Sequence, residues 1–124
     1  MELAIPMTTD HIKKNKPKSN LHNAISRAIN AHPECRNASV DYEPFHFCKG
    51  GIWSEGDVAV TLKNRKERLT FKLNHEALDL MYTLWYDPKH CNDGFLYLTD
   101  DCEKNWCIYE ENLTKEPIQP CSPA

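Results

Sequence analysis

Alternation of apolar and polar residues between residues 57 and 73 is the feature of this sequence that most constrains its fold. Two runs show the alternation, and the polar or charged residues 64–67 separate them. The apolar members are Val58, Val60 and Leu62 in the first run and Leu69, Phe71 and Leu73 in the second. Period-two alternation is typical of strands that bury one face, so this segment predicts a β-hairpin with a charged tip.

A helix is expected to follow this hairpin directly. Asn74 is a favourable N-cap residue, and Glu76 in the first turn complements the helix dipole. The Asp87–Pro88 step predicts the end of the helix, because proline disfavours a helical conformation in the residue before it. The predicted apolar face consists of Ala77, Leu78, Met81, Leu84 and Trp85.

Other patterns predict the remaining elements. Strands are expected over residues 3–7, 38–42, 45–48, 95–98 and 106–109. The Glu43–Pro44 step between two of them indicates an edge strand or a bulge, since proline lacks a backbone donor. A short helical turn is expected over residues 11–14. A longer helix is expected after an N-cap at Ser19, with an apolar face of Leu21, Ala24, Ile25, Ala28 and Ile29.

Hairpin strands that are separate from the helices favour an α+β fold. We therefore expect a mostly antiparallel sheet with two main helices packed on one face. Residues 1–111 would form this single domain, and a chain of 124 residues is long enough to bury a core without disulfides. Residues 112–124 contain three prolines and predict an irregular C-terminal tail.

The charge of the chain is unevenly distributed, although the net charge is only −3. Residues 1–37 carry a balance of +3, residues 38–99 of −2 and residues 100–124 of −4. The sequence shows neither a secretory signal nor an apolar run of the ~18 residues that a membrane span needs, so we expect a cytoplasmic protein. In that compartment the six cysteines are expected to be thiols rather than a disulfide framework.

Two groups of metal-ligating or nucleophilic residues have poor spacing. His90, Cys91, Cys102 and Cys107 supply four soft ligands, but their separations do not match the tight cysteine pairs of zinc sites. His46 and Cys48 share one face of a strand, where side chains two residues apart lie about 7 Å from each other. We therefore predict no catalytic residue, no metal ligand and no cofactor.

Two clusters of basic residues are the candidate partner-binding features. The first is Lys13 and Lys14, followed by Lys16 and Lys18. The second surrounds the predicted hairpin tip and consists of Lys63, Arg65, Lys66 and Arg68. Trp53, on the sheet face beside the hairpin, completes the predicted set. Such clusters suit an acidic protein groove or a phosphate backbone.

Several short motifs are spread over residues 3–99. The first is the opening Ile5-x-Met7-Thr8-x-Asp10-His11-Ile12, and the others are Asn23-Ala24-Ile25, Val40-x-Tyr42, Tyr86-Asp87 and Phe95-x-Tyr97. Together they resemble the motifs of a family of small phage and prophage proteins, in which the opening corresponds to a strand and a Thr-x-x-His-Ile turn. The resemblance implies a mobile-element context, in which small cytosolic proteins often bind and block a host machine.

The leading functional hypothesis is therefore a non-enzymatic binding protein. In its specific form it is a phage-type, anti-CRISPR-like inhibitor of a host defence complex, with a host protein or ribonucleoprotein as partner in the host cytoplasm and no membrane partner. The first alternative is a nucleic-acid-binding accessory protein that uses the two basic clusters. The second alternative is a small zinc- or thiol-dependent protein.

Overall fold

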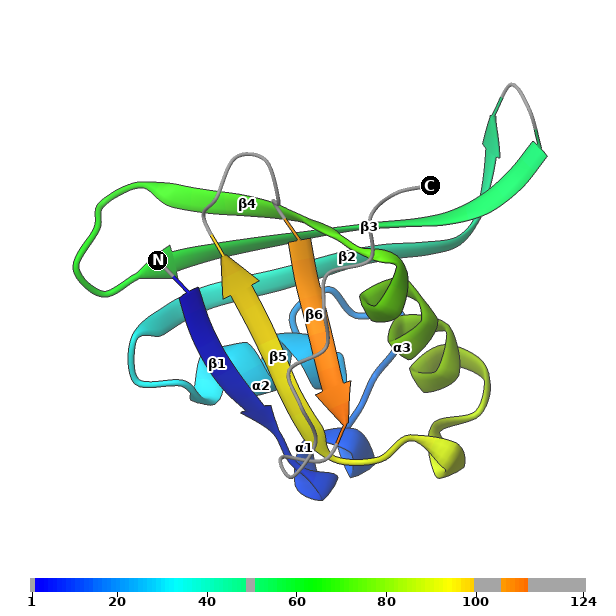
Figure 1. Ribbon diagram of the computed structural model, residues 1–124, viewed down its shortest axis with the longest axis horizontal. Helices are drawn as coiled ribbons and strands as arrows, with labels where there is room; N and C mark the ends of the chain where they lie inside the picture. Colours follow the sequence, from blue (N-terminus) through cyan, green and yellow to red (C-terminus); the bar gives the residue numbers. More distant parts are fainter. Residues whose placement is uncertain (1, 49–50, 100–105, 112–124) are drawn as a thin grey trace.

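The chain forms one six-stranded sheet with helices against it (Figure 1). The computed structural model describes residues 2–48, 51–99 and 106–111, and it places side chains over residues 3–44 and 55–99. The strands are β1 (Glu2–Met7), β2 (Cys35–Cys48), β3 (Gly51–Leu62), β4 (Arg68–Leu73), β5 (Gly94–Thr99) and β6 (Trp106–Glu111). The helices are α1 (Thr9–Lys13), α2 (Ala24–Ala31), α3 (His75–Tyr86) and the short 3₁₀ helix η1 (Pro88–His90). The predicted tail over residues 112–124 lies outside the described residues.

The strand order is β1-β5-β6-β4-β3-β2, and four of the five neighbouring pairs are antiparallel. The exception is the parallel pairing of β4 with β6, in which the described residue pairs are Lys72 with Trp106 and Leu73 with Cys107. Figure 1 shows that β1, β5 and β6 run at a steep angle to β2, β3 and β4, so the sheet bends at this junction. The predicted α+β class with a mostly antiparallel sheet is confirmed, and the parallel junction is an addition that local sequence patterns did not predict.

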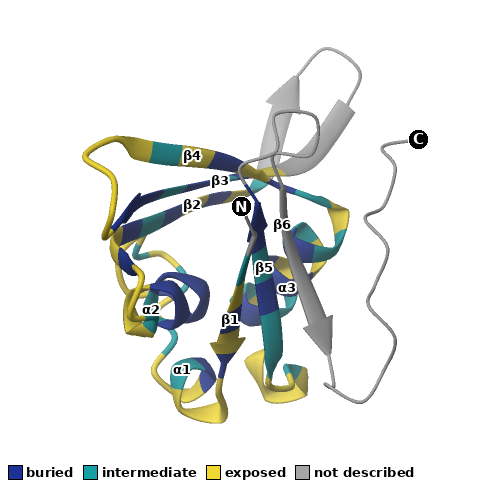
Figure 2. Ribbon diagram, turned by 60° about the vertical axis from the view of Figure 1, so that its left-hand side comes forward, coloured by how far each residue is buried: buried dark blue, intermediate teal, exposed yellow. Residues whose placement is uncertain are grey.

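The two main helices, α2 and α3, lie inside the bend of the sheet (Figure 2). Helix α2 packs against β2 and β1, and α3 packs against β6, β3 and β4. The side chains that they bury join those of the strands in one core. Its largest fully buried members are Ile5, Met7, Ile25, Ile29, Val40, Val58, Val60, Met81, Leu84, Leu96 and Leu98. Among the described helices, none is long and apolar enough to cross a membrane.

The hairpin and the following helix form as their patterns predict. Val58, Val60 and Leu62 are buried on β3, and Asn74 caps α3 by accepting the Ala77 backbone N–H at 2.9 Å. The buried face of α3 contains Leu80 in addition to the predicted Ala77, Met81 and Leu84, while Leu78 and Trp85 are partly buried.

Helix α2 begins later than predicted. Its N-cap is Asn23 rather than Ser19, and Leu21, which was expected on the apolar face, is 56% exposed. Residues 19–22 form turns before the helix. The Asn23 Oδ1 accepts the Ser26 backbone N–H at 2.8 Å, and this acceptor satisfies one of the N–H groups that a helix start leaves without a partner.

Strand β2 is continuous where two strands were expected. Its register with β3 shifts between Arg36 and Ser39 and again between Glu43 and His46. Pro44 lies in the second irregularity, on an edge strand, as its missing N–H predicts. The first irregularity contains Asn37, whose φ of 54° is in the left-handed region that asparagine tolerates.

Asparagines cover part of the outer edge of β2. The Asn30 side chain accepts the Ala38 N–H at 2.8 Å and donates to the Ala38 carbonyl at 3.2 Å. The Asn20 carbonyl accepts the Val40 N–H at 2.9 Å, and the Asn23 Nδ2 donates to the Val40 carbonyl at 3.0 Å. Edge groups paired in this way cannot template another strand, which is how native sheets limit aggregation.

The substitution Asn23→Asp tests the link between α2 and β2. Aspartate is a good N-cap residue, but its carboxylate replaces the buried donor to the Val40 carbonyl with an acceptor. We expect the free energy of unfolding to fall by about 2–3 kcal/mol, measured by denaturant unfolding. Asn30→Asp makes the same change at an exposed residue and is expected to cost less. Equal stability of Asn23→Asp and the wild type would show that only the cap matters.

A reciprocal cap holds the short helix α1. The Thr8 hydroxyl accepts the His11 N–H at 3.3 Å, and the His11 Nδ1 accepts the Thr8 N–H at 3.0 Å. Burial lowers the pKa of His11, and the charges of Lys14 and Arg27 act in the same direction, whereas Asp10 opposes them. The folded protein therefore favours neutral His11, the form whose Nδ1 can accept a hydrogen bond.

This cap predicts a pH dependence of stability. The pKa of His11 is lowered from 6.5 in the folded state, so the unfolded chain binds this proton more readily. The contribution of His11 to stability is therefore complete above pH 6.5, the pKa in the unfolded chain, and it is lost as the pH falls through the lower pKa of the folded state. Between about pH 7.5 and about pH 5.5, the free energy of unfolding of the wild type should fall by more than that of His11→Gln. The glutamine amide can accept a hydrogen bond but does not titrate. Identical slopes for both proteins would contradict this assignment.

Candidate functional site

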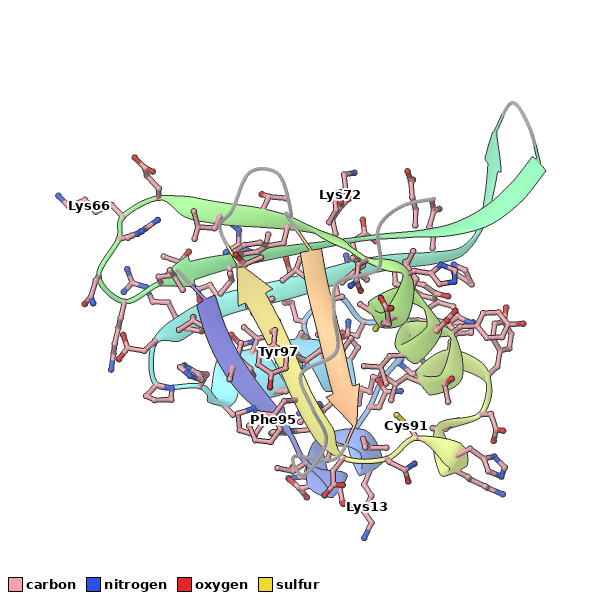
Figure 3. All side chains as sticks on the ribbon, in the orientation of Figure 1. Lys13, Lys66, Lys72, Cys91, Phe95 and Tyr97 are labelled. Carbon is pink, nitrogen blue, oxygen red and sulfur yellow. The ribbon has the colours of Figure 1, made fainter. Side chains whose placement is uncertain are left out.

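The tip of the β3–β4 hairpin is the most prominent concentration of positive charge among the described residues. Residues 63–67 connect the two strands, and Lys63, Arg65 and Lys66 are exposed. The Lys63 N–H donates to the Glu34 carbonyl at 2.9 Å, which ties the base of the loop to the segment between α2 and β2. The Arg65 N–H donates to the Leu62 carbonyl at 3.0 Å and closes the turn. Lys66 projects outward from the end of the molecule (Figure 3).

Arg68 has a different position from the other predicted members of this cluster. It begins β4, and its guanidinium reaches across β3 to β2. The Nη1 donates to the Asn37 carbonyl at 2.6 Å and lies 3.5 Å from the Thr61 hydroxyl, while the Nη2 donates to the Ser39 hydroxyl at 3.2 Å. These bonds hold the bulge of β2, so the structure assigns Arg68 a role in the fold rather than at the tip.

A hollow of about 290 Å³ adjoins the tip. Leu3 from β1 and Leu62 at the end of β3 supply apolar walls, and Glu34, Asn64 and Arg65 supply polar groups. Its residues come from three distant parts of the sequence. A recess with both apolar and charged walls suits a side chain of a protein partner better than it suits a bare phosphate.

The second predicted cluster does not join the first. Lys13 and Lys14 are exposed on α1, and Lys14 pairs with Asp10 at 3.1 Å. Figure 3 places Lys13 far from Lys66. The predicted binding residue Trp53 lies in β3 opposite His46 of β2, but its side chain is outside the described residues.

Another exposed cation of the hairpin is already paired. The Lys72 Nζ lies 3.1 Å from the Asp57 Oδ1 across the β3–β4 pair, and this hydrogen bond and charge raise the pKa of Lys72. The pair leaves little net charge at the end of β4 next to α3. The positive charge of the hairpin is therefore concentrated at its tip.

Within the described part of the chain, Cys35 approaches His32, a pair that the sequence patterns did not indicate. The Cys35 Sγ lies 4.0 Å from the His32 Nδ1, but this nitrogen also accepts the Glu34 N–H at 3.1 Å. Burial, with a smaller effect of Glu34, raises the pKa of Cys35 to about 11. The thiol is therefore protonated at neutral pH, whereas a cysteine nucleophile must be a thiolate.

The predicted metal and thiol candidates lie mainly outside the described part of the chain. Cys102 is not described, and neither are the side chains of His46, Cys48 and Cys107. Over the residues that are described, no three histidine, cysteine or carboxylate groups are arranged to hold a metal ion.

An exposed aromatic pair on α3 was also missed. Tyr82 and Tyr86 are 47% and 48% exposed, and their ring centroids lie 4.7 Å apart. The helical period that predicted the buried face places these two residues, four apart, on the opposite face. Their exposure therefore follows from the same helical period that predicts the buried face of α3.

Comparisons of this chain with protein-family models, with curated proteins and with solved structures give no match.

The roles of Arg68 and Lys66 can be separated by matched substitutions. Arg68→Gln removes the guanidinium bonds to Asn37 and Ser39, so we expect it to lower the free energy of unfolding by about 1 kcal/mol. Lys66→Gln removes the same charge from the exposed tip and should change stability by less than about 0.5 kcal/mol. Thermal or denaturant unfolding of both variants checks this, and equal effects would show that the bonds of Arg68 to β2 do not stabilise the fold.

Proposed function

We propose that this chain is a small non-enzymatic binding protein that docks its β3–β4 tip onto an acidic surface of a partner protein. The observation that carries this proposal is the exposed trio of Lys63, Arg65 and Lys66 on a loop anchored to the Glu34 carbonyl. Anchoring reduces the backbone entropy lost on binding, and long basic side chains then reach the partner.

The hollow beside the tip supports a protein partner. Leu3 and Leu62 can receive an apolar side chain, and Arg65 lines the same recess. An arginine there can bind a carboxylate through two parallel hydrogen bonds. The chemistry therefore fits a segment in which an apolar residue stands close to an aspartate or glutamate.

Nucleic acid is the competing class of partner. A phosphate backbone is held best by cations that follow one continuous surface. In this chain the cations of α1 and of the tip are far apart, and Lys14 and Lys72 are paired with carboxylates. These observations favour an acidic protein surface over an extended nucleic-acid track.

The resemblance to phage and prophage proteins gives the proposal its specific form. In that form the partner is a host defence protein or ribonucleoprotein complex in the host cytoplasm, and binding blocks it. An anti-CRISPR-like activity is tested directly by the efficiency of plaquing of a targeted phage on a host with an active CRISPR system. Expression of the wild type should restore plaques, and expression of a tip variant should not.

Reversing two charges of the tip is the principal test. We expect Arg65→Glu with Lys66→Glu to weaken association at least tenfold, or about 1.4 kcal/mol, because both residues are exposed and face the proposed partner. The measurement is quantitative capture of proteins from a bacterial lysate, followed by titration of the captured partner. Thermal unfolding should be unchanged, since exposed substitutions stay within about 0.5 kcal/mol.

The control is Lys13→Glu with Lys14→Glu, which makes the same change of charge on α1 and should retain the partner. Unchanged affinity of the tip variant would refute the proposal. Gel shifts of duplex DNA and single-stranded RNA test the alternative. A mobility shift that weakens steeply with salt and disappears in the tip variant would assign the site to nucleic acid.

A further inference from the structure

Helix α3 presents a face that the core does not use. Its exposed residues His75, Asp79, Tyr82 and Tyr86 follow one another at spacings of four, three and four, so they form one stripe along the helix. Tyr82 and Tyr86 are two of the three large hydrophobic residues that are exposed in the described part of the chain. Their rings contact each other at an angle of 43°, which makes them a single aromatic ridge. Exposed aromatic groups of this kind are typical of binding surfaces.

The charges around the aromatic ridge are acidic. Helix α3 contains Glu76 and Asp79 but no lysine or arginine, and its C-cap is Asp87. Asp79 and Asp87 are largely exposed, and the nearby cations are Lys89 and the histidines His75 and His90. Both histidines pair with these carboxylates.

Tyrosine rings beside carboxylates bind arginine and lysine by two effects. The ring face attracts a cation, and the guanidinium of arginine also stacks on it. A neighbouring carboxylate adds a charge-assisted hydrogen bond. The stripe on α3 therefore selects a partner that presents basic side chains on a projecting element.

This chain carries such an element itself. Residues 63–67 contain three basic residues and one acidic residue, and the tip that they form projects from the end of the molecule opposite α3 (Figures 1 and 3). The distance prevents contact within one molecule but not between two. The complementary charges of the tip and of α3 identify a second copy as the occupant of the stripe.

We propose that the Tyr82–Tyr86 face of α3 binds the β3–β4 tip of a second copy of this chain. The two surfaces are different, so the contact is heterologous, and each added copy leaves a tip and a helix face for the next one. Association is therefore head-to-tail and grows with concentration. This inference needs no foreign partner, and it implies that self-association competes with the partner of the proposed function for the tip.

Two variants that each block one surface test the proposal. The tip variant carries Arg65→Glu and Lys66→Glu, and the face variant carries Tyr82→Ala and Tyr86→Ala. Sedimentation velocity from micromolar to near-millimolar concentration should give a rising average mass for the wild type. Each variant alone should remain monomeric, with a dissociation constant raised at least about tenfold. An equimolar mixture should form a heterodimer that does not grow, because it retains one intact tip and one intact face.

The controls exclude loss of folding and general effects of charge. Circular dichroism melting should show that both variants remain folded, and Lys13→Glu with Lys14→Glu should associate like the wild type. Raising the salt concentration should weaken the wild-type association, because the contact is between exposed charges.

Two results would overturn the proposal. The first is a wild type that stays monomeric at every concentration; a response of its tyrosine fluorescence to hexa-arginine peptide would then assign the stripe to a foreign basic partner. The second is a mixture that stays monomeric although the face variant alone has lost association, which would indicate contact between two helix faces instead. Each result is independent of whether the tip captures a foreign protein.

Discussion

The buried side-chain amide of Asn23 joins the start of α2 to the preceding turn and to β2. Its oxygen caps α2 by accepting the Ser26 N–H, and its nitrogen donates to the carbonyl groups of Ser19 and Val40. Asn15 makes a similar link, since its oxygen accepts the Ala24 N–H at 2.8 Å and its nitrogen donates to the Leu84 carbonyl at 2.9 Å. A buried amide whose groups are satisfied fixes geometry, because any displacement leaves a donor or an acceptor without a partner. The two asparagines thereby set α2 in place against β2 and the end of α3.

Holding α2 in this position also decides which surfaces remain for binding. Asparagines from α2 and the preceding turn occupy outward backbone groups of β2 at Ala38 and Val40. The opposite edge strand, β1, contains Pro6, which has no N–H to offer a further strand. Sheet extension is therefore disfavoured at both edges over these segments. Among the described side chains, the hairpin tip and the outer face of α3 remain as projecting surfaces with distinctive chemistry.

These two surfaces have opposite character and lie at opposite ends of the molecule. The tip combines exposed cations with a recess walled by Leu3 and Leu62, and α3 combines exposed tyrosines with carboxylates. Such separation matters because a protein with both charges on one face would neutralise them internally, as Lys72 and Asp57 do at the end of β4. A small net charge is therefore compatible with two strong and separate local fields.

The sequence by itself determined the elements whose signals are local. Alternation over residues 57–73, the Asn74 cap and the Asp87–Pro88 stop predicted the hairpin, α3 and the α+β class, because each depends on neighbours within a few residues. The tertiary structure alone decided the parallel β4–β6 junction, the bonds of Arg68 to β2, the hollow at the tip and the separation of Lys13 from Lys66. It also replaced Ser19 with Asn23 as the cap of α2. Each of these depends on which distant backbone groups meet, and neither periodicity nor charge spacing contains that information.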